Sequence, residues 1–174
     1  MLFRSIAVFR SNLRRIAGST VGIIGLGNIG RAFASRIRGF GPESIVAYDP
    51  YVPQTTADLY GVRLVSLDEL LTTSDYITIH TPSTAETHHL INSDTLSRMK
   101  KNAILINCAR GPLVDPAALQ IALQSGQIEA AGLDVTETEP IDAADPLLRI
   151  AKLIIKIGRA HVSTPVPTLP RMPS

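Results

Sequence analysis

Short apolar segments alternate along the chain with segments whose apolar residues recur at helical spacing. The short segments are rich in β-branched residues and have the length of strands buried on both faces of a parallel sheet. They predict six strands, over residues 20–24, 44–48, 76–80, 103–107, 130–135 and 153–157. Because helical segments separate consecutive strands, the order predicts a series of βαβ units.

The predicted helices carry terminal signals of their own. They cover residues 29–37, 66–71 and 93–99, and a further helix follows residue 115. Ser66 and Glu69 have the spacing of a capping box. Asp115 and Pro116 are typical of a helix start, and Gly126 is typical of its C-cap. The sequence therefore predicts an α/β fold of the Rossmann type: a three-layer, doubly wound parallel sheet with helices on both faces.

Composition and local bias divide the chain into three parts. With 174 residues, 45% hydrophobic and 18% charged, it suits one globular domain. Residues 1–18 are predicted as an N-terminal helical segment, 19–157 as the nucleotide-binding domain, and 158–174 as an irregular, proline-rich tail. The first segment has no apolar run long enough for a membrane span or a signal peptide, which leaves a docking helix or, as the alternative, a mitochondrial presequence.

Charge and cysteine content exclude several classes of partner. The net charge is +2, and no basic block is present, so neither a nucleic acid nor a membrane is expected as a partner. Cys108 is the only cysteine, which rules out an internal disulfide and favours a reducing, cytoplasmic location.

A glycine-rich loop follows the first predicted strand. Its sequence, GLGNIG, fits the pattern G-x-G-x-x-G. Gly25 would form the tight turn, Gly27 would let a diphosphate approach the backbone, and Gly30 would let helix and strand pack closely. Asn28 and Ile29 stand at the helix start, where backbone N–H groups favour an anion. Because a strand leads in and a helix follows, the loop predicts a dinucleotide site.

An acidic residue at the end of the second predicted strand indicates which dinucleotide is bound. Asp49 stands at this position. A carboxylate there accepts hydrogen bonds from the adenosine ribose and repels a 2′-phosphate, which favours NAD over NADP. The alternative is that Asp49 and Pro50 merely begin a turn.

Six longer segments are more specific than the glycine loop. They are TVGIIGLGNIGR, AYDPY, LVSLDELL, ITIHTPSTAETHHLI, MKKNAILINCARGPLVD and AAGLDVTETEP. Together they cover roughly residues 13–148 and resemble, in the same order, the D-isomer-specific 2-hydroxyacid dehydrogenases. The resemblance implies an NAD-dependent oxidoreductase that interconverts 2-hydroxy acids and 2-keto acids, with such a small acid as its substrate.

The resemblance also assigns roles to residues. Arg110 would bind the substrate carboxylate and polarise the carbonyl, a task suited to its planar guanidinium. Glu139 would pair with the acid/base histidine and favour its protonated form, with Glu137 nearby as the surface-carboxylate alternative. Asp134 would lie near the nicotinamide carboxamide. The loops that would lie along the cofactor contain His80, Thr81, Pro82, Cys108 and Ala109. For the cysteine, filling space is the expected role, with a nucleophile as the alternative.

Two features depart from the family pattern. An ungapped comparison places Gly158 where the family has its acid/base histidine, and His161 follows three positions later, outside the pattern. The likeness ends near Leu148, and only a short segment precedes Gly25. We therefore expect the substrate domain to be absent and the chain to be a truncated fragment with little or no catalysis of its own.

Three histidines raise the question of a metal site. His80, His88 and His89 have no cysteine or carboxylate at ligand spacing, and adjacent residues of a helix point in different directions. We therefore predict no metal site.

Other functions of the same fold stay open from the sequence. One is a non-catalytic, NAD-sensing binding module similar to the corepressor relatives of this family. Another is a Rossmann domain for S-adenosylmethionine, which the glycine loop disfavours. Self-association into a homodimer through the cofactor domain is a further expectation.

Overall fold

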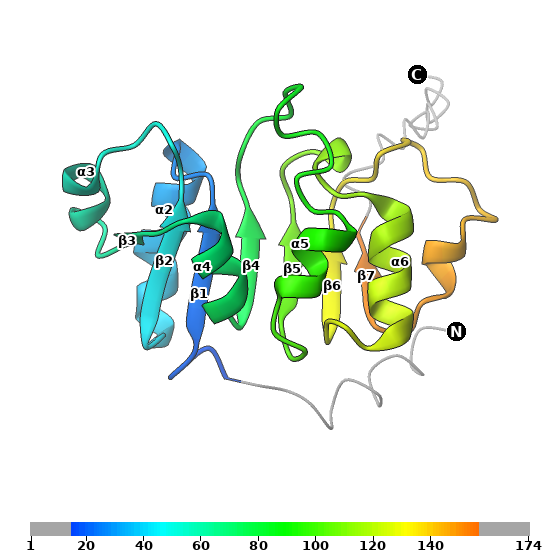
Figure 1. The fold of residues 1–174 in the computed structure, drawn as a ribbon, viewed down its shortest axis with the longest axis horizontal. Helices are drawn as coiled ribbons and strands as arrows, with labels where there is room; N and C mark the ends of the chain where they lie inside the picture. The colour runs from blue at the N-terminus through cyan, green and yellow to red at the C-terminus, as the bar shows by residue number, and fades with distance from the viewer. Residues whose placement is uncertain (1–14, 157–174) are drawn as a thin grey trace, which may run out of the picture.

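A computed structural model describes residues 15–156 of the chain. Its centre is a seven-stranded sheet in which every neighbouring pair of strands is parallel (Figure 1). The strand order is β3-β2-β1-β4-β5-β6-β7. The first three strands therefore extend the sheet to one side of β1, and the strands from β4 onward extend it to the other side, so the order reverses between β1 and β4. The strands are β1 (Thr20–Ile24), β2 (Ser44–Tyr48), β3 (Arg63–Leu64), β4 (Tyr76–Ile79), β5 (Ile104–Asn107), β6 (Ala130–Leu133) and β7 (Leu153–Ile155). In such a sheet the ligand lies at the carboxyl ends of the strands, beside this reversal.

Helices cover both faces of the sheet. The α-helices are α2 (Asn28–Ile37), α3 (Gln54–Asp58), α4 (Leu67–Thr73), α5 (Ser93–Arg98) and α6 (Pro116–Ser125). Short 3-10 helices occur at η1 (Arg38–Phe40), η2 (Gly111–Leu113) and η3 (Pro146–Arg149). In Figure 1, α4, α5 and α6 lie in front of the sheet and α2 lies behind it. This three-layer arrangement confirms the predicted fold class.

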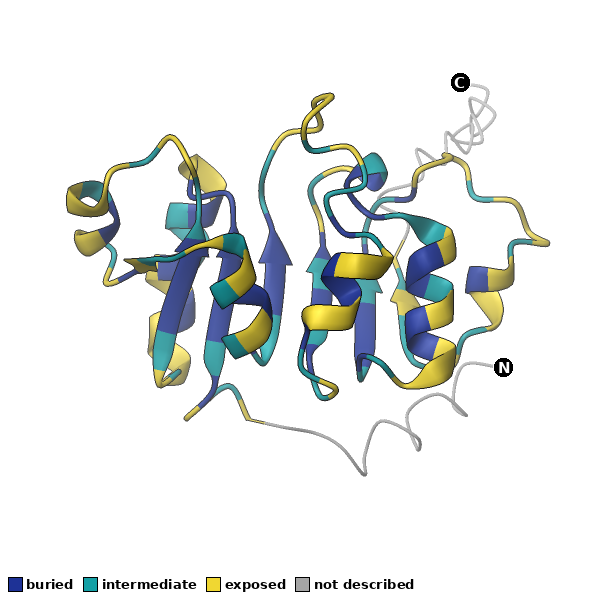
Figure 2. Cartoon of the chain, in the orientation of Figure 1, coloured by how far each residue is buried: buried dark blue, intermediate teal, exposed yellow. Residues whose placement is uncertain are grey.

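Two hydrophobic clusters fill the spaces between the layers. The larger one joins Leu70, Leu96 and Leu119 from α4, α5 and α6 to the sheet. The smaller one packs Ala34 and Ile37 of α2 on the opposite face. Figure 2 shows the central strands as the most buried part of the sheet. Since both faces of the central strands are covered, their sequences are apolar without alternation.

The predicted helix ends rest on the expected local contacts. The Asp115 side chain accepts hydrogen bonds from two backbone N–H groups of α6, and Gly126 closes that helix with a left-handed φ of 73°. The Ser66 side chain accepts from the Glu69 backbone, but the Glu69 carboxylate binds Arg63. Of the two hydrogen bonds of the predicted capping box, only the one from the Glu69 backbone N–H to the Ser66 side chain is therefore present.

Some elements differ from the sequence prediction. β3 and α3 were not predicted, because two residues and five residues are too few to show a period. The strands predicted over 76–80, 130–135 and 153–157 end one or two residues earlier, where their loops begin. Residues 15–18 are not helical, since residue 15 is irregular and a bend and a turn occupy residues 16–18. The rest of the predicted N-terminal helical segment and the proline-rich tail lie outside the described residues.

Within residues 15–156, no helix combines the length and the apolar character needed to cross a membrane.

Candidate functional site

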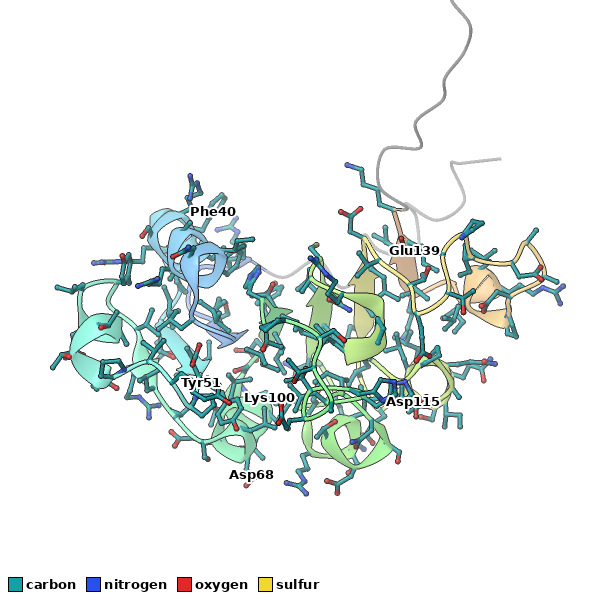
Figure 3. The ribbon with its side chains drawn as sticks, turned by 90° about the horizontal axis from the view of Figure 1, so that it is seen from above. Phe40, Tyr51, Asp68, Lys100, Asp115 and Glu139 are labelled. Carbon is teal, nitrogen blue, oxygen red and sulfur yellow. The ribbon has the colours of Figure 1, made fainter. Side chains whose placement is uncertain are left out.

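The candidate site lies at the carboxyl edge of the sheet, where the loops after β1, β2, β4, β5 and β6 meet. Figure 3 looks down on this edge, with Tyr51 from the loop after β2 on one side and Glu139 from the loop after β6 on the other. Parallel strands place all of these loops at the same edge, so residues far apart in the sequence come close together.

The glycine loop has the geometry that its sequence predicted. Gly25 has a φ of 92°, and a Cβ on it would lie 2.7 Å from the backbone nitrogen of Thr81. A Cβ on Gly30 would lie 2.2 Å from the carbonyl oxygen of Gly25. Gly27 differs, because a Cβ there would meet nothing within 4 Å. The loop is thus tightly packed on its inner side and open at Gly27.

The first turn of α2 presents backbone donors without a competing side chain. Its N-cap, Gly27, offers no side-chain cap, and the first turn contains no acidic residue. Asn28 and Ile29 are exposed there, Ile29 with 69% of its surface accessible. Free N–H groups at the start of a ten-residue helix, together with the helix dipole, favour an anionic group such as a diphosphate.

Asp49 links the glycine loop to the loop after β2. One carboxylate oxygen accepts a hydrogen bond from the Leu26 backbone at 2.8 Å, and the other accepts from the Tyr51 backbone at 2.9 Å. Each oxygen keeps a second lone pair for a ligand hydroxyl. Asp49 therefore does more than begin a turn, because it also fixes the glycine loop beside the cavity.

A cavity of about 340 Å³ opens between these loops. Its lining includes Gly25, Gly27, Tyr48, Asp49, Tyr51, His80, Thr81 and Pro82. The cavity is of the size expected for a small-molecule site, and its lining combines the predicted glycine, acidic and β4-loop residues.

The loop after β4 forms the opposite wall of this cavity. The His80 backbone N–H donates to the Ile24 carbonyl at 2.7 Å, which ties this loop to β1. The His80 ring lies 5.4 Å from the Phe33 ring, and its Nε2 is 3.1 Å from the Thr78 hydroxyl oxygen. Burial lowers the pKa of His80, so the ring is neutral at pH 7 and acts as an apolar wall with one polar edge.

The loop after β5 is held by a buried asparagine. The Asn107 side chain donates to the Arg110 carbonyl at 2.8 Å and accepts from the Ala109 N–H at 3.0 Å. Arg110 is exposed, and its guanidinium donates to the Ala109 carbonyl at 2.7 Å. Asn107 thus fixes the backbone that carries the predicted substrate-binding arginine.

Cys108 and Asp134 lie beside each other at the ends of β5 and β6. Partial desolvation of the exposed Cys108 side chain, and to a smaller degree the charge of Asp134, raises the pKa of its thiol. A raised pKa disfavours the thiolate, which is the nucleophilic form. The thiolate of Cys108 is therefore less populated at neutral pH than that of an unperturbed cysteine.

Glu139 sits in the loop after β6, which packs against the Arg110 loop. Its carboxylate accepts from the Thr136 N–H at 3.1 Å and is exposed. A Cβ on Gly111 would lie 2.0 Å from the Thr136 carbonyl oxygen, so the two loop backbones are in direct contact. The structure brings the loops of Arg110 and Glu139 together, while each side chain hydrogen-bonds to its own loop. His161 lies outside the described residues.

The histidines are arranged differently from the sequence expectation. His88 and His89 lie in a turn rather than a helix, and their rings stack with centroids 3.9 Å apart. Both rings approach the Glu137 carboxylate, while His80 lies in the cavity wall. Sequence spacing could not reveal the carboxylate, because 48 residues separate His89 from Glu137.

Two residues of this site were not identified from the sequence. Asn107 ends an apolar strand, and Gly111 follows the arginine in the same motif. For Asn107, the only sequence signal is a polar side chain at the end of an apolar strand, and the structure shows that this side chain is fully buried. The contact between Gly111 and Thr136 depends on the fold and leaves no local signal.

Asn107→Ala should destabilise the domain by about 2–3 kcal/mol, because a buried N–H and a carbonyl lose their partner and a cavity replaces the amide. Urea denaturation would measure the loss, with Gln124→Ala on the exposed side of α6 as the control. A change of less than about 0.5 kcal/mol at Asn107 would show that the loop does not depend on this amide.

The strand order, the glycine loop, the acidic residue after β2 and the uncapped helix start together define a dinucleotide-binding Rossmann domain. The chain belongs to the family described as D-isomer specific 2-hydroxyacid dehydrogenase, NAD binding domain, whose sequence profile matches residues 7–162. Membership confirms the family resemblance and confirms NAD as the cofactor predicted from Asp49.

Known proteins with similar sequences and structures agree. The chain is 47% identical over 140 residues to a D-3-phosphoglycerate dehydrogenase of Mycobacterium tuberculosis, matching 80% of this chain and 26% of that protein. The D-mandelate dehydrogenase of Rhodotorula graminis superposes with a TM-score of 0.80 at 32% identity, over 88% of this chain and 45% of the other. The formate dehydrogenase of Staphylococcus aureus, solved with NAD, gives 0.78 at 35% identity, over 86% and 44%. The chain thus spans about a quarter of the length of its D-3-phosphoglycerate dehydrogenase relatives.

Proposed function

We propose that the chain binds NAD(H) in the cavity at the carboxyl edge, between α2 and the loops after β2 and β4. The diphosphate would face the open backbone at Gly27 and the first turn of α2, beside Asn28 and Ile29. The hydroxyl groups of the adenosine ribose would donate hydrogen bonds to the Asp49 carboxylate. The observation that carries this proposal is the contrast within the glycine loop, which is filled at Gly25 and Gly30 but open at Gly27.

We further propose that the nicotinamide end lies toward β5 and β6, near Asp134, Cys108 and Ala109. Bound NAD(H) supplies the hydride acceptor or donor for the reaction. Arg110, on the adjoining loop, would hold the carboxylate of a 2-hydroxy or 2-keto acid through two parallel hydrogen bonds. Glu139 would stabilise the protonated form of an acid/base group from its exposed position.

The whole protein would accordingly interconvert a 2-hydroxy acid and its 2-keto acid. Support comes from the shared family and from the contact between the Arg110 and Glu139 loops through Gly111 and Thr136. The substrate would be small, since one guanidinium holds its carboxylate while the reacting carbon must reach the nicotinamide.

The choice between NAD and NADP tests the role of Asp49. Calorimetric titration should show tighter binding of NADH than of NADPH, because the Asp49 carboxylate would face the 2′-phosphate in the proposed binding mode. Asp49→Asn should narrow this preference by about tenfold, since removing one like-charge contact near the surface is worth about 1–2 kcal/mol.

Glu43→Gln is the matched control, because it removes one negative charge next to the opposite end of β2. It should leave the ratio of the two affinities unchanged. Equal narrowing in both variants would mean that net charge, rather than contact with Asp49, sets the preference.

A further inference from the structure

Three side chains from two distant loops converge outside the cofactor cavity. His89 Nε2 lies 2.8 Å from an oxygen of the Glu137 carboxylate, and His88 Nε2 lies 3.5 Å from the same oxygen. One potential ligand atom from each of the three residues lies within 4.8 Å of the other two. We propose that His88, His89 and Glu137 form a binding site for a divalent late transition metal ion, with Zn²⁺ as the representative ion.

The backbone holds both loops in place around this cluster. His89 has a left-handed φ of 48°, which is uncommon for a residue with a side chain, and its ring approaches Glu137. Its N–H donates to the Pro112 carbonyl at 2.8 Å, and its carbonyl accepts from the Asn92 side chain at 3.0 Å. On the other side, Thr136, which precedes Glu137, packs against Gly111. Both halves of the site are thus braced against the same segment, η2.

The three side chains converge on one point. The His88 and His89 ring centroids lie 3.9 Å apart, and the Nε2 atom of each ring approaches the same Glu137 oxygen. A divalent ion would be held by one nitrogen lone pair from each imidazole and by the anionic carboxylate. The same three groups then act as three ligands.

The ligand set and its exposure select the class of ion. Imidazole nitrogen with carboxylate oxygen suits Zn²⁺, Cu²⁺, Ni²⁺ and Co²⁺, whereas Mg²⁺ and Ca²⁺ prefer oxygen alone. Ligand atoms around tetrahedral zinc are about 3.4 Å apart, close to the His88–Glu137 separation, and the His89–Glu137 pair would open by about half an ångström. The side chain of His88 is 53% exposed and that of Glu137 is 32% exposed, so water can complete the coordination.

Metal titration of the untagged chain tests the proposal. Calorimetry with Zn²⁺ should give one ion per chain, and Co²⁺ should give visible absorption bands that added Zn²⁺ removes. Zn²⁺ should also raise the melting temperature, because the ion joins two loops of the folded state and binds it preferentially. Glu137→Gln should weaken binding by more than about tenfold, since even a residue outside the coordination sphere costs that much when lost.

A second ligand variant separates loss of the site from loss of the fold. His89→Asn keeps a residue type that tolerates a left-handed φ, and it should also weaken binding by more than about tenfold while the circular dichroism spectrum is unchanged. His161→Ala and Cys108→Ala are the controls, because they remove the exposed cysteine and the histidine that lies outside the described residues. Both controls should bind as the unchanged chain does.

Two results would overturn the proposal. One is a folded chain that takes up no Zn²⁺ or Co²⁺ in either titration. The other is binding that Glu137→Gln and His89→Asn leave intact but His161→Ala or Cys108→Ala removes. Neither result bears on NADH binding, which is measured separately in the absence of metal.

Discussion

Replacement of Gly30 by alanine is expected to abolish tight NADH binding and to lower the free energy of unfolding by about 3 kcal/mol. The added Cβ would stand 2.2 Å from the Gly25 carbonyl oxygen. That oxygen belongs to backbone and cannot rotate away as a side chain could. Either α2 must move away from the loop, or the loop must open.

The loss of cofactor affinity follows from the same displacement. Backbone N–H groups at the start of α2 are the proposed donors to the diphosphate, and a hydrogen bond to a charged group is worth about 1.5–3 kcal/mol. Losing one such bond weakens binding by about thirtyfold, and losing two weakens it by several hundredfold. Calorimetry measures the affinity for NADH, and urea denaturation of the same preparation measures the free energy of unfolding.

Gly39→Ala is the matched control for this prediction. A Cβ at Gly39 meets nothing within 4 Å, and its φ lies outside the left-handed region. It should change stability by less than about 0.5 kcal/mol and leave NADH affinity unchanged. Equal stability and equal affinity in Gly30→Ala and Gly39→Ala would mean that the close packing of the glycine loop is unimportant.

Gly111→Ala is expected to have the second large effect, again a destabilisation of about 3 kcal/mol. Its Cβ would lie 2.0 Å from the Thr136 carbonyl oxygen and 2.5 Å from the Glu137 nitrogen, so the loop after β6 would have to move. This loop carries Glu139, and its displacement should separate Glu139 from Arg110. Thermal and urea denaturation measure the stability.

The effect of Gly111→Ala on NADH should be smaller than that of Gly30→Ala. The glycine loop and Asp49 lie on the other side of the sheet's reversal point, at β1 and β2, and keep their contacts. An affinity loss in Gly111→Ala equal to that in Gly30→Ala would contradict this division of the site. Wild-type stability in Gly111→Ala would contradict the contact between the two loops.

Much of the central sheet could be predicted from the sequence because its signals are local. β1 and β2 are buried on both faces, so their apolar runs begin and end with the strands. α6 was predictable from Asp115 and Gly126, since a side-chain cap and a left-handed glycine are properties of single positions. β3 was not, because a two-residue edge strand has no period and pairs only through β2.

The candidate site likewise contains residues that local sequence motifs predict and residues that only tertiary contacts bring together. Gly25, Gly30 and Asp49 follow from a short motif and its distance to the next strand, so the sequence placed them correctly at the edge of the sheet. Asn107, Gly111 and the His89–Glu137 pair depend on which loops meet in the folded chain. Such contacts have no fixed sequence separation, and only the three-dimensional structure reveals them.

Titration of NADH into the unchanged chain and into Gly27→Val decides whether the cavity at the carboxyl edge binds NAD(H). Gly27 has a φ of −71° and open space at its Cβ, so valine should fit the free protein but would fill the proposed position of the diphosphate. We predict one NADH per unchanged chain and no measurable binding to Gly27→Val, with equal melting temperatures. Equal NADH affinity in the two proteins, or no binding by the folded unchanged chain, would contradict the proposed site.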